Sequence, residues 1–328
     1  MIAARRVKTD FRVQKQTAEQ RERFVGRDPS GGKVGAVERV QHPVKLTERA
    51  EADAFHGTDT FAVKENGAES FVHRARRIRR NPCGGIRNFP VMRGGVCIFG
   101  RFRETYGFGG KAFFCNSGAE ANEAAIKLAR RWGAANGGRY EIVTMRNSFH
   151  GRTLATITAT GQAWCQAGYD PLPVGFNYAD FNDIDSVKAA VSDKTVAIMV
   201  EAVQGEGGVN PATEEFMAGV RALCDEKNLI MICDEVQCGM GRLGTCFAFQ
   251  SFGVEPDAFS MAKGIANGVP MGAFMAKKKY ADLLTVGTHG TTFGGTALAA
   301  AAALAVQEAF DKEQVLENCA EMGKYMME

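Results

Sequence analysis

The pattern of apolar and polar positions changes near residue 110. From Lys111 onward, short apolar runs alternate with stretches in which apolar residues recur every three to four positions. Such alternation is typical of strands and helices in a parallel α/β architecture. The predicted strands are 111–115, 140–145, 195–200, 229–233, 257–261 and 271–276, and the predicted helices are 119–132, 184–191, 213–227, 277–284, 296–310 and 313–328.

The first 110 residues show neither a helical nor a strand period. They hold 22 Arg and Lys against 12 Asp and Glu, a net charge of +10, whereas the rest of the chain carries −7. A basic arm for nucleic acid is one interpretation, but no nucleic-acid motif accompanies the arginines, and we expect no nucleic-acid partner. A natural disordered extension and a misread frame upstream of a normal gene are the favoured alternatives.

Composition narrows the class of protein. The 328 residues are 45% apolar, enough for a large buried core. No run of about 18 apolar residues occurs, and no apolar stretch follows the first ten residues, so we expect neither a membrane span nor a signal peptide, and a cytoplasmic location. The nine cysteines lack the CxxC spacing, which favours free thiols over zinc or disulfides, and we expect no metal.

The segment CNSGAEANE, residues 115–123, follows a predicted strand and opens a predicted helix. Backbone N–H groups near Ser117, Gly118 and Ala119 would therefore point outward at a helix N-terminus, where anions bind. Ordinary helix capping explains the segment equally well when it is taken alone. It also lacks the lysine of a nucleotide-binding P-loop.

Two charged residues follow predicted strands. Asp234 leaves the apolar run 229–233 at the carboxyl edge, where open α/β sheets bind ligands, so it could pair with a cation such as a protonated pyridine nitrogen. Lys263 follows the run 257–261 in a region with few charges, where desolvation could keep its amine neutral for reaction with an aldehyde. Each residue could instead be a solvated surface charge.

The three features together are more specific than any one of them. An anion site, a strand-end aspartate and a strand-end lysine occur in that order within about 145 residues. They supply a phosphate cradle, a partner for a pyridinium and an amine that can bond an aldehyde. Pyridoxal 5'-phosphate (PLP) requires all three.

Six segments between residues 106 and 328 resemble class III, fold type I aminotransferases. They are FFCNSGAEANEAAIKLAR (113–130), SFHGRT (148–153), VEAVQGEGGV (200–209), CDEVQCGMGRLG (233–244), MAKGIANGVPMGA (261–273) and HGTTFGG (289–295). The resemblance implies a mostly parallel central sheet flanked by helices. It divides the chain into an atypical Arg-rich segment (1–108), a PLP-binding large domain (109–300) and the helical start of a truncated small domain (301–328).

The resemblance also implies roles for single residues. Ser117, Gly118 and Ala119 would bind the PLP phosphate, Phe149 and Val236 the ring faces, Asp234 the ring nitrogen, Gln237 the phenolic oxygen, Lys263 the aldehyde carbon, and Thr292 the phosphate of a partner subunit. Arg152, Thr291, Glu201 and Glu206 would bind substrate, with Arg152 gripping a carboxylate. Asp234 and Lys263 would be catalytic.

The implied reaction is transamination of N2-acetylornithine with 2-oxoglutarate, a step of arginine biosynthesis, by a homodimer. Aminotransferases of succinyldiaminopimelate, ornithine or 4-aminobutyrate, and an amino-group mutase, share the motifs. Ala202 stands where proline is usual, and Thr291 stands where serine is usual. The N-terminal segment does not match the family, and the chain stops at Glu328, where the family would continue with a small C-terminal domain. A catalytically inactive fragment is therefore the alternative from a different class.

Overall fold

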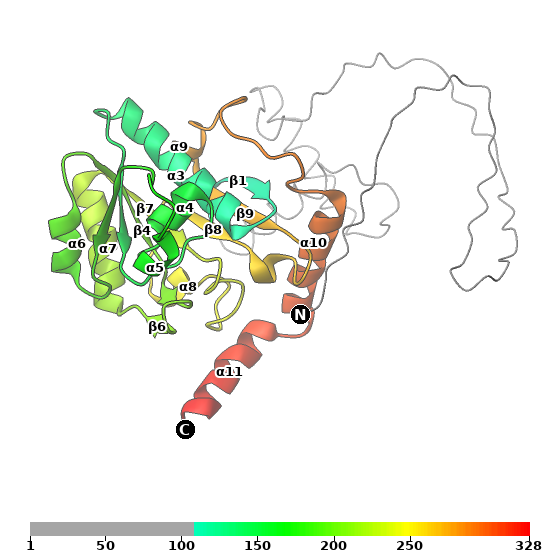
Figure 1. Ribbon diagram of the computed structural model, residues 1–328. Coiled ribbons are helices and arrows are strands. Elements are labelled where there is room, and N and C mark those ends of the chain that lie inside the picture. Colours follow the sequence, from blue (N-terminus) through cyan, green and yellow to red (C-terminus); the bar gives the residue numbers. More distant parts are fainter. Residues whose placement is uncertain (1–107) are drawn as a thin grey trace, which may run out of the picture. The chain divides into compact units, whose positions relative to one another are not determined.

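The computed structural model describes residues 108–328, so the Arg-rich segment predicted for residues 1–108 lies outside the described residues except for Phe108. A seven-stranded sheet crosses the described part (Figure 1). In spatial order its strands are β1 (Gly110–Cys115), β9 (Gly272–Lys277), β8 (Ala258–Met261), β7 (Ile230–Asp234), β4 (Thr195–Val200), β2 (Glu141–Met145) and β3 (Phe176–Ala179).

The direction of the strands confirms the predicted mostly parallel α/β sheet. Neighbouring strands are parallel from β8 to β3. Strand β9 runs antiparallel to both β8 and β1. The parallel strands therefore end at a common carboxyl edge, and the loops that follow them can converge on one site.

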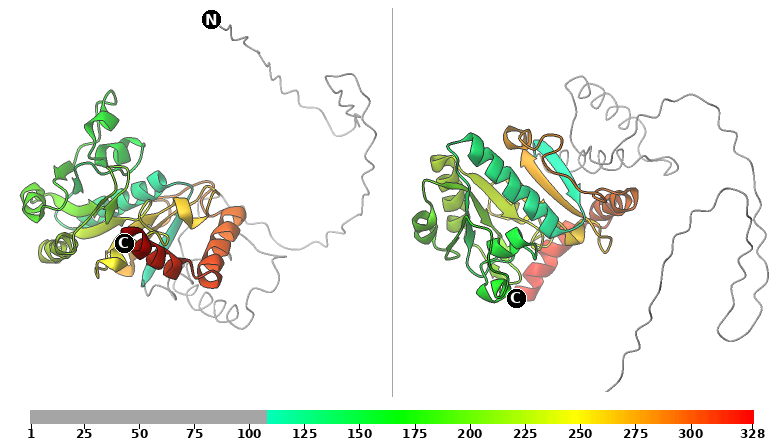
Figure 2. Two further views of the ribbon diagram at one scale, coloured as in Figure 1. Left: turned by 90° about the horizontal axis from the view of Figure 1, so that it is seen from below. Right: turned by 45° about the horizontal axis from the view of Figure 1, so that its top comes forward.

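Helices cover both faces of the sheet (Figure 2). Helix α3 (Gly118–Ala135) packs on one face, and α6 (Ile184–Ala190), α7 (Glu214–Lys227) and α10 (Ala297–Lys312) contribute to the apolar cluster on the other. In β4, Ala197 and Met199 belong to the apolar cluster on the α3 face of the sheet, and Ile198 and Val200 belong to the cluster on the opposite face. Because side chains alternate along a strand, a strand covered on both faces needs a continuous apolar run.

Local sequence explains where α3 begins and where α7 begins and ends. Helix α3 starts at Ser117, whose hydroxyl accepts the N–H of Glu120 at 3.2 Å, and buries alanines and a leucine spaced three to four apart. Helix α7 starts at Thr213, whose hydroxyl accepts the N–H of Phe216, and ends at Asn228 in the left-handed conformation, φ 50°.

Several short elements differ from the prediction. The sequence did not indicate strand β3, the hairpin of β5 (Val203–Gln204) and β6 (Asn210–Pro211), or helices α4 (Leu154–Ala159), α5 (Ala163–Gln166) and α8 (Ala248–Ser251). The helix predicted over 277–284 is correct for only half of its length, because β9 continues to Lys277 and α9 (Lys278–Ala281) ends before residue 282. Within residues 108–328 no helix is long and apolar enough to span a bilayer.

The predicted boundary between the large and small domains lies within the C-terminal helices. The boundary at residue 300 falls inside α10, whose Ala299, Ala300 and Ala303 pack in the same apolar cluster as β7 and β8. The following helix, α11 (Val315–Met327), has no buried residue. A separate unit after residue 300 therefore stays a prediction, and α10 belongs by its packing to the sheet domain.

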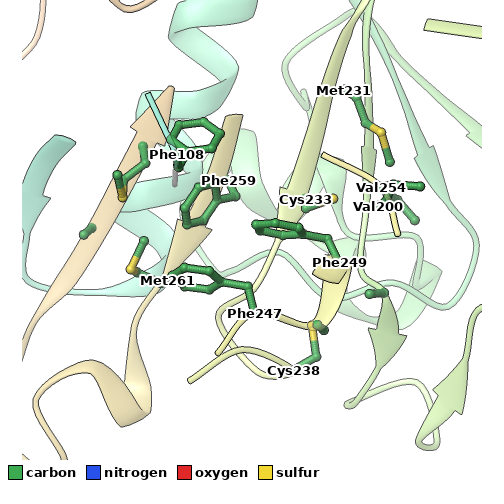
Figure 3. Packing of buried hydrophobic residues seen from close by; sticks show 14 of the residues in the cluster. Phe108, Val200, Met231, Cys233, Cys238, Phe247, Phe249, Val254, Phe259 and Met261 are labelled. Carbon is green, nitrogen blue, oxygen red and sulfur yellow. The ribbon is translucent and has the colours of Figure 1, made fainter. Parts of the chain in front are cut away.

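A group of phenylalanines packs behind β7 and β8 (Figure 3). Phe259 of β8 contacts Phe108, Phe247 and Phe249, with ring centroids 4.9, 4.7 and 5.3 Å away. These separations are typical of favourable tilted and edge-to-face aromatic pairs. The strands whose ends carry Asp234 and Lys263 therefore rest on a closely packed apolar cluster.

Candidate active site

A cleft of about 690 Å³ lies where the loops after β1, β2, β4, β7 and β8 meet. This volume is typical of a small-molecule site, and the position is where parallel α/β sheets bind ligands. Eleven of the thirteen predicted site residues line it: Ser117, Gly118, Ala119, Phe149, Arg152, Glu201, Glu206, Asp234, Val236, Gln237 and Lys263.

The N-terminus of α3 forms one end of the cleft. The N–H groups of Gly118 and Ala119 belong to the first turn and have no acceptor inside the helix. A Cβ on Gly118 would lie 2.7 and 2.8 Å from the two methyl groups of Val236, so the close approach of helix and loop requires glycine. The helix end therefore brings N–H groups without intrahelical acceptors to the cleft, an arrangement that favours an anion.

Asp234 is buried at the end of β7, and both of its carboxylate oxygens are fixed. Oδ2 lies 2.7 Å from Nδ2 of Asn122 and 2.7 Å from Nδ1 of His150. Oδ1 accepts the N–H of Val236 at 3.0 Å and the hydroxyl of Ser260 at 3.3 Å. These contacts hold the carboxylate in one orientation beside the cleft, as a partner for a bound cation.

His150 is fully buried beside Asp234. Burial lowers the pKa of its imidazole, but the hydrogen bond and charge of Asp234, with the charge of Glu201, outweigh burial and raise the pKa above its ordinary value. Nδ1 faces Asp234, and Nε2 has no partner among the described residues. The histidine therefore partly balances a buried negative charge.

Glu201 and Glu206 occupy different environments. Glu201 is 4% exposed, and its Oε2 accepts the N–H of Phe149 at 3.0 Å. Burial raises the pKa of Glu201 to about 8, although the positive charge of His150 opposes the rise. Glu201 therefore binds the loop that carries Phe149, whereas the carboxylate of Glu206 is exposed in the cleft.

Lys263 lies directly after β8, with a backbone φ of 48° that is unfavourable for a side chain by about 1–2 kcal/mol. Its Nζ donates to Oε1 of Gln237. The expectation that burial desolvates this lysine is wrong, because the turn projects the side chain into the open cleft, where it is exposed. Lys263 and Asp234 line the same cleft from adjacent strands.

Two predicted threonines lie apart from this lining. The Thr291 hydroxyl accepts Nδ2 of Asn116 at 3.1 Å, directly beside the N-terminus of α3 in the same chain. Thr292 is exposed and does not line the cleft. Arg152 lines the cleft, and its guanidinium carbon lies 5.4 Å from the centroid of the Phe149 ring and 5.3 Å from that of Trp164.

Sequence reasoning missed Asn122, His150, Ser260 and Arg242. Asn122 lies on the buried face of α3, where a polar residue among alanines could have indicated a buried partner. His150 follows Phe149 directly in the segment SFHGRT, residues 148–153. Arg242 brings a second guanidinium to the cleft lining, and no pattern in its segment indicated that.

The family model described as "Aminotransferase class-III" matches residues 102–328. Over 219 residues the chain is 52% identical to the acetylornithine aminotransferase of Methanocaldococcus jannaschii and 50% identical to that of Myxococcus xanthus. Each match covers 66% of this chain and 55% of the relative. The chain therefore spans about half the length of the curated relatives it matches.

Solved structures agree with these matches. The ornithine aminotransferase of Toxoplasma gondii, described as having partial PLP occupancy at its active site, is 28% identical with a TM-score of 0.68, covering 78% of this chain and 61% of that one. A Bacillus anthracis aminotransferase is 29% identical with a TM-score of 0.67, covering 78% of this chain and 64% of that one.

Proposed function

The chain belongs to the class-III aminotransferases, and on that premise we propose that it transfers the amino group of N2-acetylornithine to 2-oxoglutarate, as in arginine biosynthesis. One observation carries the proposal: the exposed N-terminus of α3, the fixed carboxylate of Asp234 and the amine of Lys263 line one cleft. These residues fit PLP, the cofactor that the family implies. When bound, PLP supplies a ring that accepts electrons from the substrate carbon.

The position of each residue in the cleft suggests which part of PLP it would bind. Asp234 would pair with the protonated ring nitrogen of PLP, and the N–H groups of Gly118 and Ala119 would bind its phosphate. Gln237 already contacts the Lys263 amine and would bind the neighbouring phenolic oxygen. Lys263 would hold the cofactor through its amine, and that amine would take a proton from the substrate carbon that bears the amino group.

The remaining cleft residues bind the rest of the ligands. Phe149 and Val236 would pack against the faces of the pyridine ring, and the Arg152 guanidinium would bind a substrate carboxylate. Glu206 is free to pair with a cation from outside the described residues. We also infer a homodimer, because Thr292 and the 71% exposed Phe293 form a surface that a second copy could cover. Sedimentation of the PLP-loaded protein as a monomer would contradict the dimer.

The test begins with covalent attachment. The full chain is incubated with PLP, reduced with borohydride and digested, and mass spectrometry should find the adduct on Lys263. A Lys263→Ala protein should lose the adduct, and Lys263→Arg serves as a control that keeps the charge. An adduct that persists in both variants would refute the assignment.

Substrate is tested on the unreduced protein. Addition of N2-acetylornithine should shift the absorbance of the bound cofactor, and 2-oxoglutarate should reverse the shift. Ornithine, 4-aminobutyrate and succinyldiaminopimelate are the matched competitors. A faster shift with one of these would reassign the amino donor, and attachment without a shift by any donor would identify an inactive fragment.

A further inference from the structure

An exposed tryptophan lies beside the cleft. Trp164, in the short helix α5, is 64% exposed although its ring is large and apolar. Its Nε1 donates to Oε1 of Gln162 at 2.9 Å, and Nε2 of Gln162 donates to the carbonyl of Ser148 at 3.0 Å. The indole is thus tied to the loop that carries Phe149 and Arg152.

The guanidinium of Arg152 lies over two aromatic rings. Its central carbon is 5.3 Å from the centroid of Trp164 and 5.4 Å from that of Phe149, both within the range of cation–π attraction. No carboxylate of residues 108–328 pairs with Arg152. The rings therefore restrict the guanidinium while its N–H donors stay available to a ligand.

We propose that Trp164 is a positioning residue for Arg152, the residue that would bind the substrate carboxylate. By restricting the Arg152 guanidinium before the substrate binds, Trp164 favours amino donors that carry a carboxylate. The identity of the donor rests on the proposed function, whereas the contact between indole and guanidinium does not. A long arginine side chain loses rotamer freedom when it binds a ligand, and a prearranged one has less to lose.

A matched pair of donors tests the inference. N-acetylputrescine is N2-acetylornithine without its carboxylate. In the PLP-loaded full chain, Trp164→Leu should raise KM for N2-acetylornithine about two- to fivefold, as expected for an exposed cation–π contact, with kcat and KM for N-acetylputrescine unchanged. Trp164→Phe keeps a ring and should restore most of the loss. Equal changes for both donors, or no change for either, would overturn the proposal.

A second readout is independent of turnover. The chain has two tryptophans, and Trp132 packs against Tyr280 at 5.1 Å, away from the cleft lining, so a Trp132→Phe protein reports on Trp164 alone. Its fluorescence should change on adding N2-acetylornithine and stay constant with N-acetylputrescine. A fluorescence change with N2-acetylornithine alone, without amino transfer, would support the role of Trp164 and contradict the proposed reaction. Equal fluorescence changes with both compounds would contradict the role of Trp164.

Discussion

Replacing Gly118 with alanine tests how tightly α3 is seated against the loop after β7. The new methyl group would lie 2.7 and 2.8 Å from the two γ-carbons of Val236, far inside ordinary contact. Val236 cannot retreat easily, because its side chain is short and branched and its N–H is bound to Asp234 at 3.0 Å. Overpacking of this kind costs about 1–3 kcal/mol.

We therefore expect Gly118→Ala to lower the free energy of unfolding by about 1–3 kcal/mol in guanidinium titrations, and to weaken PLP binding because the first turn of α3 must shift. Gly323→Ala is the matched control: it lies in α11 with nothing within 4 Å of the new methyl group, and should be neutral or stabilising by up to about 1 kcal/mol.

A double variant isolates the contact. Val236→Ala removes both γ-carbons, so Gly118→Ala should cost much less in that background, with a coupling of about 0.5–3 kcal/mol between the two sites. Additive effects, or a Gly118→Ala protein as stable as the parent chain, would refute the steric argument.

Three further predictions concern stability. The pKa of Glu201 is 4.5 ordinarily and about 8 in the folded chain, so its protonated form stabilises the folded chain at low pH, and this contribution is lost as the pH rises from about 4.5 to about 8. The free energy of unfolding should decline less over this pH range in Glu201→Gln. An unchanged slope would contradict the prediction. Asn122→Ala removes a donor from buried Asp234 and should cost about 1.5–3 kcal/mol by urea titration, whereas a loss below about 0.5 kcal/mol would mean that the bond contributes little. Asn228 has φ 50°, so Asn228→Gly should keep the melting temperature and Asn228→Val should lower it; equal values would argue against backbone strain.

The long strands could be predicted from sequence because they are buried on both faces. All six residues of β4 are buried, and the five from 196 to 200 form an uninterrupted apolar run. Strand β3 lies at the edge of the sheet and has one fully buried residue, Ala179, so its sequence resembles a loop. Helix predictions were most accurate for α6 and α7, each of which begins after a residue whose side chain caps the helix.

The candidate site was only partly predictable for a related reason. Asp234 and Lys263 were indicated by their position directly after apolar strands, a local property. Asn122 and His150 reach Asp234 from 112 and 84 residues away, and such contacts depend on packing that no local pattern records. The exposure of Lys263 likewise depends on the openness of the cleft.

The antiparallel pairing of β1 with β9 affects how the protein can be made. Gly110 lies opposite Lys277, so a ribosome must add 167 residues after the first strand position before its hydrogen-bond partner exists. At 5–20 residues per second this takes roughly 8–30 s. During that time β1, with Phe113 and Phe114, lacks β9, the strand that pairs with it within residues 108–328, and the N-terminus of α3 is not yet held in place. Nascent chains of this protein should therefore engage chaperones until β9 emerges, and cofactor binding should begin only after that point in synthesis.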